Sequence, residues 1–416
     1  MEKINRVVLA GNFLFPSGSA SAKRMQNLAL GLAEMGTNVH VLPLAPICVS
    51  EGGAARTYRL GPNVTCEPMA TTHRPVPARN PLCRKPLWFL RTYGAALRAY
   101  WRLRELVKAG RCDLLIAYGR SMIMLAPLVS LCRTHGLPAL LDVVELHSQF
   151  NGFGGRASPI YWDWYLGQRI LPHWFDGLLI IAQGLRSVYE DVGVTQFLRV
   201  PAIEDWDDAQ AGSKTRPNRT PFHLVCVTKL IERDAPGVLL EAMRFLSMRQ
   251  VPIQLNLLGK FREVPGSRRW VRLCEKDPHL RQVVNLVGRV SDESLMRHFS
   301  RADGFVLTRR DARPEMCSFP TRLVEYLKTG RPVLVSAVGD IPDYLRDGVD
   351  AIFLSPDDSA QVAQVIADVA ANPARARDIG RRGRCTGARV FDRTTHAARI
   401  LEFAEGLRKA KATGER

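Results

Sequence analysis

The chain lacks the patterns that mark a metal centre or a membrane span. Its nine cysteines form no Cys-x-x-Cys pair and show no spacing typical of a zinc site. We therefore expect reduced, mostly buried thiols in a cytoplasmic protein that binds no metal. No apolar run approaches the roughly 20 residues that a membrane-spanning helix needs, so any membrane contact should be peripheral.

Two familiar phosphate-binding fingerprints are also absent. The opening loop PSGSASAKR, residues 16–24, has neither the Lys-Ser/Thr ending of a P-loop nor the spacing of a G-x-G-x-x-G motif. A signal peptide is not expected, because Gly11 and Asn12 interrupt the short apolar start and an amphipathic helix pattern follows. The loop still offers Gly18 for close approach of the backbone to a ligand, with Arg24 at the start of the next helix. The alternative for Gly18 is a tight strand-to-helix turn.

Acidic residues are few relative to basic ones. Lys and Arg total 58 against 40 Asp and Glu, which gives a net charge of +18. Such a surplus favours contact with phosphates or with an anionic surface. A nucleic-acid-binding protein is the more distant interpretation, because the basic residues are dispersed and no zinc-finger spacing or RNP-like aromatic motif is present.

What the sequence does contain is two successions of apolar strands and amphipathic helices. A chain of 416 residues exceeds what one hydrophobic core usually supports, which predicts two domains. Both halves have the alternating order of a doubly wound α/β fold with a parallel sheet. The expected strands are residues 5–10, 39–44, 113–118, 139–145 and 177–182 in the first half, and 223–228, 254–259, 283–288, 304–308 and 332–336 in the second.

The domain boundaries follow from a change in composition. AQAGSKTRPNRT, residues 209–220, is typical of a linker. We expect an N-terminal Rossmann-like domain over 1–205, a linker over 206–220 and a second Rossmann-like domain over 221–390. The tail, residues 391–416, contains an amphipathic helix pattern that we expect to pack back on the N-terminal domain.

One segment of the second half combines a loop, a helix start, an acid and a buried strand. It is EMCSFPTRLVEYLKTGRPVLVS, residues 315–336. Ser318 is expected to cap the helix, Pro320 to lie in its first turn and Gly330 to end it. Amide groups at such a helix start attract anions, and Glu325 falls on the helix face that would meet a bound ribose diol. The alternative for Glu325 is a solvated helix acid.

Five segments, in order along the chain, match one enzyme family. They are FPSGSASAKRMQNLALGLAEMGTNVHVL, GLLIIAQGLRSVYEDVGV, VGRVSDESLMRHFSRADGFVLTRR, SFPTRLVEYLKTGRPVLVS and GDIPDYLRDGVDAIFLSPDD. This set, which extends over nearly the whole chain, resembles the GT-B glycosyltransferases, and specifically glycosyltransferase family 4. The resemblance implies two facing Rossmann-like domains, of which the first binds the acceptor and the second the nucleotide-sugar donor. It also implies sugar transfer with retention at the anomeric carbon, without a bound metal.

The family's signature is a pair of glutamates with seven residues between them. Glu325 matches the second, which resembles the ribose-binding acid. Cys317 stands in place of the first, and the nearest acid is Glu315, so either Glu315 takes that role or loop amides hold the donor sugar. The other expected donor contacts in this loop are Ser318, Phe319, Pro320 and Thr321.

Basic residues follow the first strand of the second half, where open α/β sheets place ligands. Breaking a sugar–diphosphate bond leaves negative charge on the departing phosphate, and fixed cations stabilise it. Lys229 resembles the family's first basic residue, and Arg233 is the expected second cation because Asp234 occupies the usual position. The alternative for both is a solvated loop charge.

The resemblance implies three further sets of contacts. Gly18 would lie beside the donor phosphates, and the turn with Arg289 and Val290 would contact the nucleobase. Glu145 and His147 stand at the end of the strand ALLDVVE, where family members often carry a His or an acid near the reacting centre, and both are candidates. A retaining reaction does not require a strong general base, so either residue can position the donor sugar or the acceptor instead.

Residues 84–104, RKPLWFLRTYGAALRAYWRLR, interleave basic and aromatic side chains, which is typical of an interfacial helix. The alternative is a domain helix whose aromatics pack on the sheet. We hypothesise docking on the inner face of the cytoplasmic membrane, where a glycan or lipid-linked acceptor would be glycosylated in cell-surface polysaccharide or lipopolysaccharide synthesis.

The resemblance therefore implies a retaining, hexose-transferring enzyme that uses a UDP- or GDP-sugar as co-substrate and needs no other cofactor. Two alternatives of the same fold remain, a catalytically silent nucleotide-sugar binder, which would explain Cys317, and a nucleotide-sugar epimerase. No nucleic-acid partner is expected.

Overall fold

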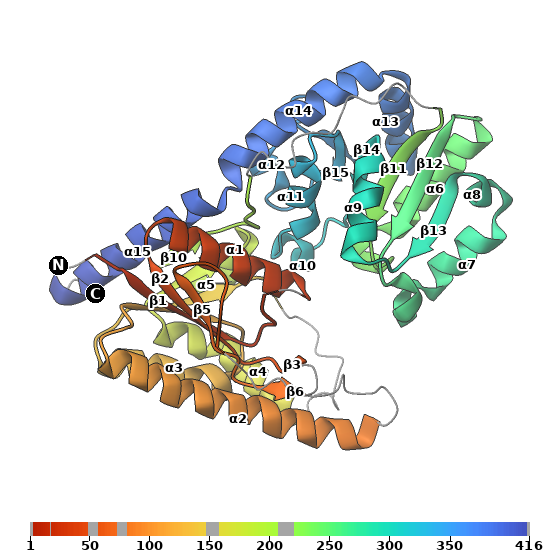
Figure 1. Cartoon of the computed structure of the whole chain (residues 1–416). Coiled ribbons are helices and arrows are strands. Elements are labelled where there is room, and N and C mark those ends of the chain that lie inside the picture. The colour runs from red at the N-terminus through yellow and green to blue at the C-terminus, as the bar shows by residue number, and fades with distance from the viewer. Residues whose placement is uncertain are drawn as a thin grey trace. The chain divides into compact units, whose positions relative to one another are not determined.

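The computed structural model describes residues 3–16, 18–48, 57–72, 81–146, 158–206 and 220–413. They form two compact α/β units (Figure 1). The first unit takes Met1–Ile203 and Arg393–Arg416, and the second takes Glu204–Asp392. Each contains a mostly parallel sheet with helices on its faces, as the alternation of strand and helix patterns predicts.

The five apolar segments expected in the first half form the central strands of an eight-stranded sheet. They are β1 (Arg6–Gly11), β2 (Asn38–Pro43), β7 (Leu114–Tyr118), β8 (Ala139–Val143) and β9 (Gly177–Ile180), and they pair in parallel. Short strands that the sequence did not indicate complete it, namely β4 (Tyr58–Arg59), β5 (Val64–Cys66) and β10 (Phe197–Arg199). The order is β10-β9-β8-β7-β1-β2-β5-β4, and β3 (Ile47–Cys48) pairs separately with β6 (Thr71–Thr72).

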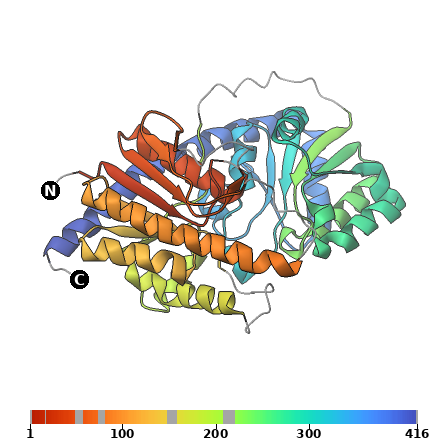
Figure 2. The same cartoon turned by 60° about the horizontal axis from the view of Figure 1, so that its bottom comes forward.

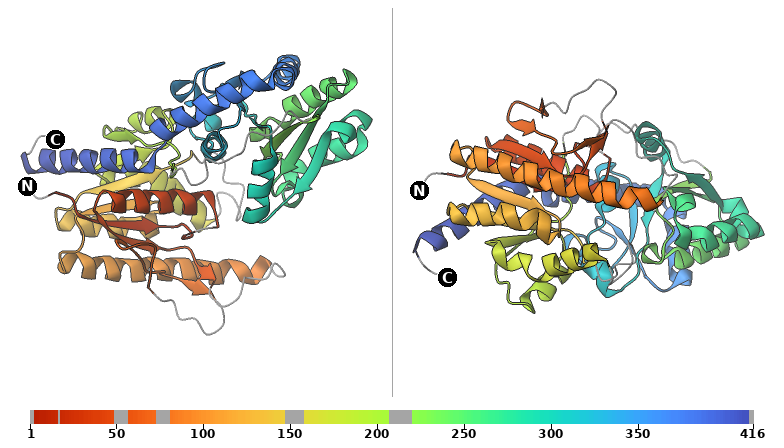
Figure 3. Two further views of the ribbon diagram at one scale, coloured as in Figure 1. Left: turned by 45° about the horizontal axis from the view of Figure 1, so that its top comes forward. Right: turned by 90° about the horizontal axis from the view of Figure 1, so that it is seen from below.

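Helices cover both faces of this sheet. One face carries α1 (Ala20–Glu34) and α15 (Arg393–Thr413), and the other carries α2 (Pro81–Lys108) and α3 (Met122–Thr134), as Figures 1 and 2 show. Next to α3 lie α4 (Pro159–Arg169) and the 3-10 helix η2 (Leu171–Trp174), and Figure 3 shows α2, α3 and α4 beside one another. A short helix, α5 (Gly184–Glu190), follows β9.

The C-terminal helix α15 is part of the first unit. Its Ile400 is fully buried in the core that α1 and the sheet also form. A Cβ atom on Gly31 of α1 would lie 2.6 Å from the carbonyl oxygen of Arg393, so only glycine allows the two helices to approach this closely. At the other end of α15, Lys411 Nζ lies 2.7 Å from a carboxylate oxygen of Asp176. The first unit is therefore built from both ends of the chain.

The second unit contains a six-stranded parallel sheet. Its strands are β11 (Phe222–Val227), β12 (Ile253–Leu258), β13 (Val284–Gly288), β14 (Gly304–Leu307), β15 (Val333–Ser336) and β16 (Ile352–Leu354), in the order β13-β12-β11-β14-β15-β16. The first five match the expected segments, whereas the three-residue β16 was not anticipated.

Helices flank this second sheet in turn. The longer ones are α6 (Pro236–Met248), α7 (Arg268–Lys276), α9 (Asp292–Arg301), α11 (Thr321–Lys328), α13 (Ser359–Ala371) and α14 (Pro373–Val390). Shorter turns are α8 (Pro278–Val283), α10 (Arg313–Met316), α12 (Ile341–Tyr344), η4 (Glu232–Asp234), η5 (Phe261–Glu263) and η6 (Pro265–Ser267).

The strand order of the first unit fixes where a ligand can enter. The chain runs from β1 outward to β2 in one direction, while β7, β8 and β9 follow on the other side of β1. At such a switch point the loops after neighbouring strands diverge and leave a crevice at the carboxyl ends of the strands. The first unit is therefore expected to bind a ligand after β1 and β7.

Most of the cysteines behave as the sequence predicts. Six of the described cysteines are buried, and Cys385 is exposed. Burial raises the pKa of the Cys66 thiol to about 12, which makes it a poor nucleophile. No helix in the described ranges is long and apolar enough to cross a membrane.

Candidate functional site

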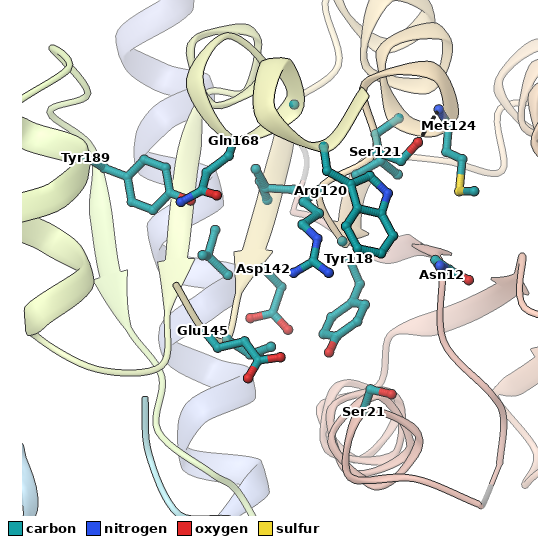
Figure 4. A pocket seen from close by; sticks show the side chains of 17 residues that line it. Asn12, Ser21, Tyr118, Arg120, Ser121, Met124, Asp142, Glu145, Gln168 and Tyr189 are labelled. Carbon is teal, nitrogen blue, oxygen red and sulfur yellow. Dashed lines mark hydrogen bonds between the residues drawn. The ribbon is translucent and has the colours of Figure 1, made fainter. Parts of the chain in front are cut away.

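A pocket of about 210 Å³ opens at the carboxyl ends of β1, β7 and β8 (Figure 4). All of its lining residues belong to the first unit. They come from the ends of β7 and β8, from the loops after the three strands and from four helices, and comprise Asn12, Ser21, Tyr118, Gly119, Arg120, Ser121, Met124, Leu125, Leu141, Asp142, Val143, Val144, Glu145, Trp164, Gly167, Gln168 and Tyr189. The pocket thus lies at the switch point of the sheet.

Two close backbone contacts shape this pocket. A Cβ atom on Gly11 would lie 2.1 Å from the carbonyl oxygen of Tyr118, and one on Gly167 would lie 1.8 Å from that of Arg120. Only glycine at these positions lets the β1 end and helix α4 press against the loop that follows β7. The same loop is tied down by Asp163 of α4, whose carboxylate accepts hydrogen bonds from Ser121 Oγ at 2.6 Å and from the amide of Ile123 at 2.8 Å. The loop that carries Arg120 is therefore held on two sides.

A buried ion pair lies at the base of the pocket. Arg24 donates through Nε and Nη2 to the two carboxylate oxygens of Asp142, at 2.8 and 2.7 Å. It also donates to the carbonyls of Val200 and Pro201. Both partners are almost fully buried, with 6% and 1% of their surfaces exposed. The donors of Arg24, at the start of α1, are therefore occupied inside the unit.

Arg120 is the other cation of the pocket. Its guanidinium carbon lies 3.9 Å from the centre of the Trp164 ring, a cation–π arrangement. No hydrogen-bond acceptor among the described residues pairs with this guanidinium, in contrast to Arg24. Burial lowers the pKa of Arg120 to about 10, although the fields of Glu145, Tyr118 and Tyr189 act in the opposite direction. The charge of Arg120 is thus only partly compensated within the pocket.

Glu145 is the predicted residue that the structure brings to this pocket. It follows β8, and in Figure 4 its side chain points toward the same space as Arg120 and Asp142. His147, the other candidate, lies outside the described residues. The acid at the strand end was identifiable from the sequence, whereas Arg120 and Trp164 were missed because 44 positions separate them in the chain.

Gly18 belongs to the loop between β1 and α1, and its φ of +108° favours glycine. The adjacent Ser19 caps α1 by accepting a hydrogen bond from the amide of Ala22 at 3.1 Å. This geometry is that of a tight strand-to-helix turn. It is equally compatible with a backbone approach by a ligand.

In the second unit, the loop before α11 departs from the prediction. The helix begins at Thr321 with Pro320 in the N-cap position, and no side chain caps it. Ser318 is therefore not the cap. Ser318 lies two positions before the N-cap, which is too early for its hydroxyl to reach the first free amides of the helix. Its hydroxyl instead accepts a hydrogen bond from Arg309 Nη2 at 2.8 Å. Gly330, with φ of +71°, ends the helix as expected.

The residues around Ser318 are largely inside the unit. Cys317 is 1% exposed and Phe319 is 5% exposed, so neither side chain presents much surface to a ligand. Glu315 is in α10, but its side chain lies outside the described part of the chain. The amide of Cys317 donates to the carbonyl oxygen of Arg313 at 3.2 Å, so this amide is occupied inside the unit.

Glu325 lies on the second turn of α11 and forms an ion pair with Arg322 one turn earlier. Its side chain is only 16% exposed, so it is not a simple solvated helix acid. The next residue, Tyr326, is fully buried and accepts a hydrogen bond from the amide of Val227 at 2.8 Å. That contact fixes α11 beside the end of β11, where the basic loop begins.

The loop after β11 is ordered by an acid. The Asp234 carboxylate accepts hydrogen bonds from Thr228 Oγ1 at 2.6 Å and from the amide of Lys229 at 2.9 Å. The backbone carbonyl of Asp234 accepts another from Thr308 Oγ1. Asp234 thus shapes the loop in place of the basic residue that the family usually has there. The side chains of Lys229 and Arg233 are exposed, which suits a phosphate contact and a solvated charge alike.

The predicted nucleobase turn follows β13. Gly288 ends this strand with φ of +84°, and Val290 is partly buried. Arg289 is 63% exposed and lies 3.6 Å from Glu263, a weak surface pair. No group of three or more metal-ligating side chains is present within the described ranges.

Comparison with known proteins supports the resemblance seen in the sequence. The family described as "Glycosyl transferases group 1" matches residues 221–372, within the second unit. The amylovoran biosynthesis glycosyltransferase AmsK of Erwinia amylovora is 27% identical over 147 residues, which are 35% of this chain and 35% of that protein. The chain thus matches only about a third of the length of this relative.

Two further proteins are similar. A GDP-mannose-dependent alpha-(1-6)-phosphatidylinositol monomannoside mannosyltransferase of Mycolicibacterium smegmatis is 24% identical over 190 residues, 45% of this chain and 49% of that protein. The structure of HepE from Anabaena in complex with UDP gives a TM-score of 0.63 at 13% identity, covering 96% of this chain and all of that one. The fold is therefore that of the GT-B glycosyltransferases, as the sequence predicts.

Proposed function

We propose that this chain, whose second unit matches the group 1 glycosyltransferases, transfers a sugar from a nucleotide-sugar donor to an acceptor hydroxyl. The observation that carries the proposal is the family match over residues 221–372, which contains both Glu325 and the basic loop after β11. The structure adds that Tyr326 ties these two features together. A ribose ligand and a phosphate ligand would thus be held at one edge of one sheet.

The donor is proposed to be a UDP- or GDP-sugar. One similar protein is named as GDP-mannose-dependent, and another was solved with UDP. Glu325 would accept hydrogen bonds from the ribose hydroxyls, and the loop of Cys317 to Thr321 would contact the donor sugar and its phosphates. Arg289 and Val290 would adjoin the base, and Gly18 of the first unit would approach the phosphates. Glu315 would contact the donor sugar only if it takes the role of the family's first glutamate, in place of Cys317.

The chemical step is proposed to proceed with retention and without a metal. Charge that develops on the leaving diphosphate would be stabilised by Lys229 and Arg233 and by the amides at the start of α11. Glu145 is exposed to the pocket of the first unit, so it would position the acceptor or the donor sugar. His147 remains a second candidate for the same role.

The acceptor is proposed to bind in the pocket of the first unit and to be a glycan or a lipid-linked glycan for cell-surface polysaccharide or lipopolysaccharide. Exposed apolar residues of three adjacent helices favour a membrane-bound acceptor: Leu97 and Trp101 of α2, Ile123 of α3 and Trp162 of α4 are each about half exposed or more. Basic side chains stack on this face, such as Arg104 over Trp101 at 5.2 Å. We propose that this face rests on an anionic membrane on its cytoplasmic side.

Liposome flotation tests the membrane proposal. The double variant Leu97→Ser/Trp101→Ser should lose binding to vesicles that contain anionic phospholipid, because the burial of both side chains in the interface drives docking. The matched control is Met248→Ser/Leu273→Ser, which removes two exposed apolar residues of the second unit. Equal flotation of both variants and the wild type would refute docking through α2.

A nucleotide screen tests the enzymatic proposal. A ligand present at 100 times its dissociation constant should stabilise the protein by about 2.7 kcal/mol, which raises the melting temperature measurably. We expect UDP- or GDP-sugars to do so, and release of UDP or GDP with transfer to added membrane extract to follow. Binding without release would identify a silent binder, and a changed sugar on an intact donor would identify an epimerase. Salt-dependent DNA binding without nucleotide affinity would favour the nucleic-acid interpretation.

A further inference from the structure

We infer that the pocket of the first unit binds an anionic group of the acceptor, a phosphate or a carboxylate, through the guanidinium of Arg120. The inference rests on the proposed function, in which the acceptor occupies this pocket. It adds a chemical class for that acceptor and a residue that selects it.

The first support is the placement of Arg120. Its backbone is pressed against α4 at Gly167, and its side chain stacks on Trp164 at 3.9 Å. Asp163 holds the following residues, Ser121 and Ile123, through hydrogen bonds of 2.6 and 2.8 Å. The guanidinium is therefore presented into the pocket by a fixed loop, as Figure 4 shows. A fixed, planar donor fork loses little freedom when a ligand binds.

The second support is that the two carboxylates of the pocket do not neutralise Arg120. Asp142 already receives Arg24 on both oxygens, at 2.8 and 2.7 Å. Glu145 acts on Arg120 through its field, but no ion pair with Arg120 forms among the described residues. Arg24 and Arg120 thus differ: Arg24 donates four hydrogen bonds beneath the pocket, whereas Arg120, which lines it, packs on an aromatic ring and has open donors.

The third support is energetic. A charge that is taken partly out of water needs a partner, and the lowered pKa of Arg120 shows that burial outweighs the attraction of Glu145. A phosphate or carboxylate would supply charge-assisted hydrogen bonds, which are shorter and stronger than those of a neutral hydroxyl. A neutral sugar would leave the charge of Arg120 uncompensated. An acceptor with an anionic group is therefore the better match.

The position of Glu145 sets the orientation of such an acceptor. Like charges in one pocket repel, so the anionic group should contact Arg120 and Trp164 while hydroxyl groups face Glu145. Because the pocket has a cation, Arg120, on one side and an anion, Glu145, on the other, an acceptor with a charge at one end only would bind in a single orientation.

Binding of simple probes by the full-length protein tests the inference. Titration calorimetry would compare glucose 1-phosphate, glucuronate and glucose, with UDP and GDP as references for the second unit. We expect one of the two anionic sugars to bind about tenfold or more tightly than glucose. Tighter binding of glucose 1-phosphate identifies a phosphate acceptor group, and tighter binding of glucuronate identifies a carboxylate. The inference is overturned if neither exceeds glucose, even where the nucleotides bind and the proposed function stands.

Variants assign the preference to Arg120. Arg120→Gln should remove the difference between the anionic and the neutral sugar and leave nucleotide affinity unchanged. Arg169→Gln is the matched control. Arg169 lies on α4, the helix that also carries Trp164, and its guanidinium stacks on the exposed Tyr165 ring at 5.0 Å outside the pocket. Arg120→Lys keeps the charge without the fork and should weaken the preference about threefold, which secures a result if Arg120→Gln does not fold. An anion preference that persists at wild-type strength in these variants would place the anion elsewhere, at the nucleotide site for example, and would overturn the inference.

Discussion

The two units place charge differently at the carboxyl ends of their sheets. In the first unit, Arg24 and Asp142 are buried against each other, and Arg120 is fixed on Trp164. In the second unit, the side chains of Lys229 and Arg233 are exposed, and Asp234 holds their loop by accepting hydrogen bonds from Thr228 Oγ1 and from the amide of Lys229. The first site thus presents a cation that is held by an aromatic ring and by close backbone packing. The exposed side chain of Lys229 would lose rotamer freedom when it binds a ligand, at a cost in side-chain entropy.

The largest effect should come from breaking the buried pair. Asp142→Ala leaves the charge of Arg24 buried without its partner and should reduce the free energy of unfolding by about 3–5 kcal/mol. Chemical denaturation measures it. The control is Asp378→Ala, which removes an exposed partner of Arg381 and should change stability by less than about 0.5 kcal/mol. Similar losses in both variants would show that the first unit does not depend on this pair.

Removing a cation from the second unit should reduce turnover and leave stability nearly unchanged. Lys229→Ala should leave the melting temperature nearly unchanged, because the side chain is exposed. Turnover should fall on the order of 100-fold if Lys229 stabilises the leaving phosphate. Steady-state kinetics with the donor found in the screen measures this. Normal turnover of Lys229→Ala would mean that Lys229 is a solvated loop charge and does not contact the leaving phosphate.

Glu325→Gln probes the acid of the second unit. Loss of a charged acceptor for the ribose diol should weaken nucleotide binding about tenfold, since hydrogen bonds to charged groups contribute about 1.5–3 kcal/mol each. Calorimetric titration with UDP and GDP measures the change. Glu190→Gln is the matched control, because Glu190 forms a comparable ion pair with Arg186 on α5 of the first unit. Equal affinities in both variants and the wild type would mean that Glu325 does not contact the ribose.

The smallest effect is expected from a helix cap of the first unit. Ser19→Ala removes the acceptor of the Ala22 amide at the start of α1 and should cost about 1 kcal/mol of stability. Ser318→Ala has no such cap to lose, and its effect should depend on the hydrogen bond from buried Arg309. Thermal denaturation of both variants compares them. If Ser19→Ala is neutral, water replaces the cap without loss.

Long apolar segments made most of the fold predictable from the sequence. Strands such as β8 and β12 repeat buried residues often enough to be recognised, whereas β10 and β16 contain three residues each and carry no readable periodicity. The cap assigned to Ser318 was wrong because helix starts depend on local backbone geometry that a single serine does not determine.

The site was only partly predictable for a different reason. Glu145 was found because it directly follows a strand, which is a local signal. The partnership of Arg24 with Asp142 spans 118 positions and exists only after folding. A signal was present, since an Asp inside the apolar strand β8 requires a buried partner. The identity of that partner was not readable from the chain.

Helix α15 has a consequence for how the protein is made. Ile400, Leu401 and Ala404 close the core that contains Ile4 and Met25, so the two ends of the chain meet in one hydrophobic interior. Translation delivers these residues after the whole second unit, because Arg393–Arg416 follow Glu204–Asp392 in the chain. Until then, one side of the nascent first unit stays open to chaperones and proteases. A chain that lacked α15 would leave this part of the core exposed.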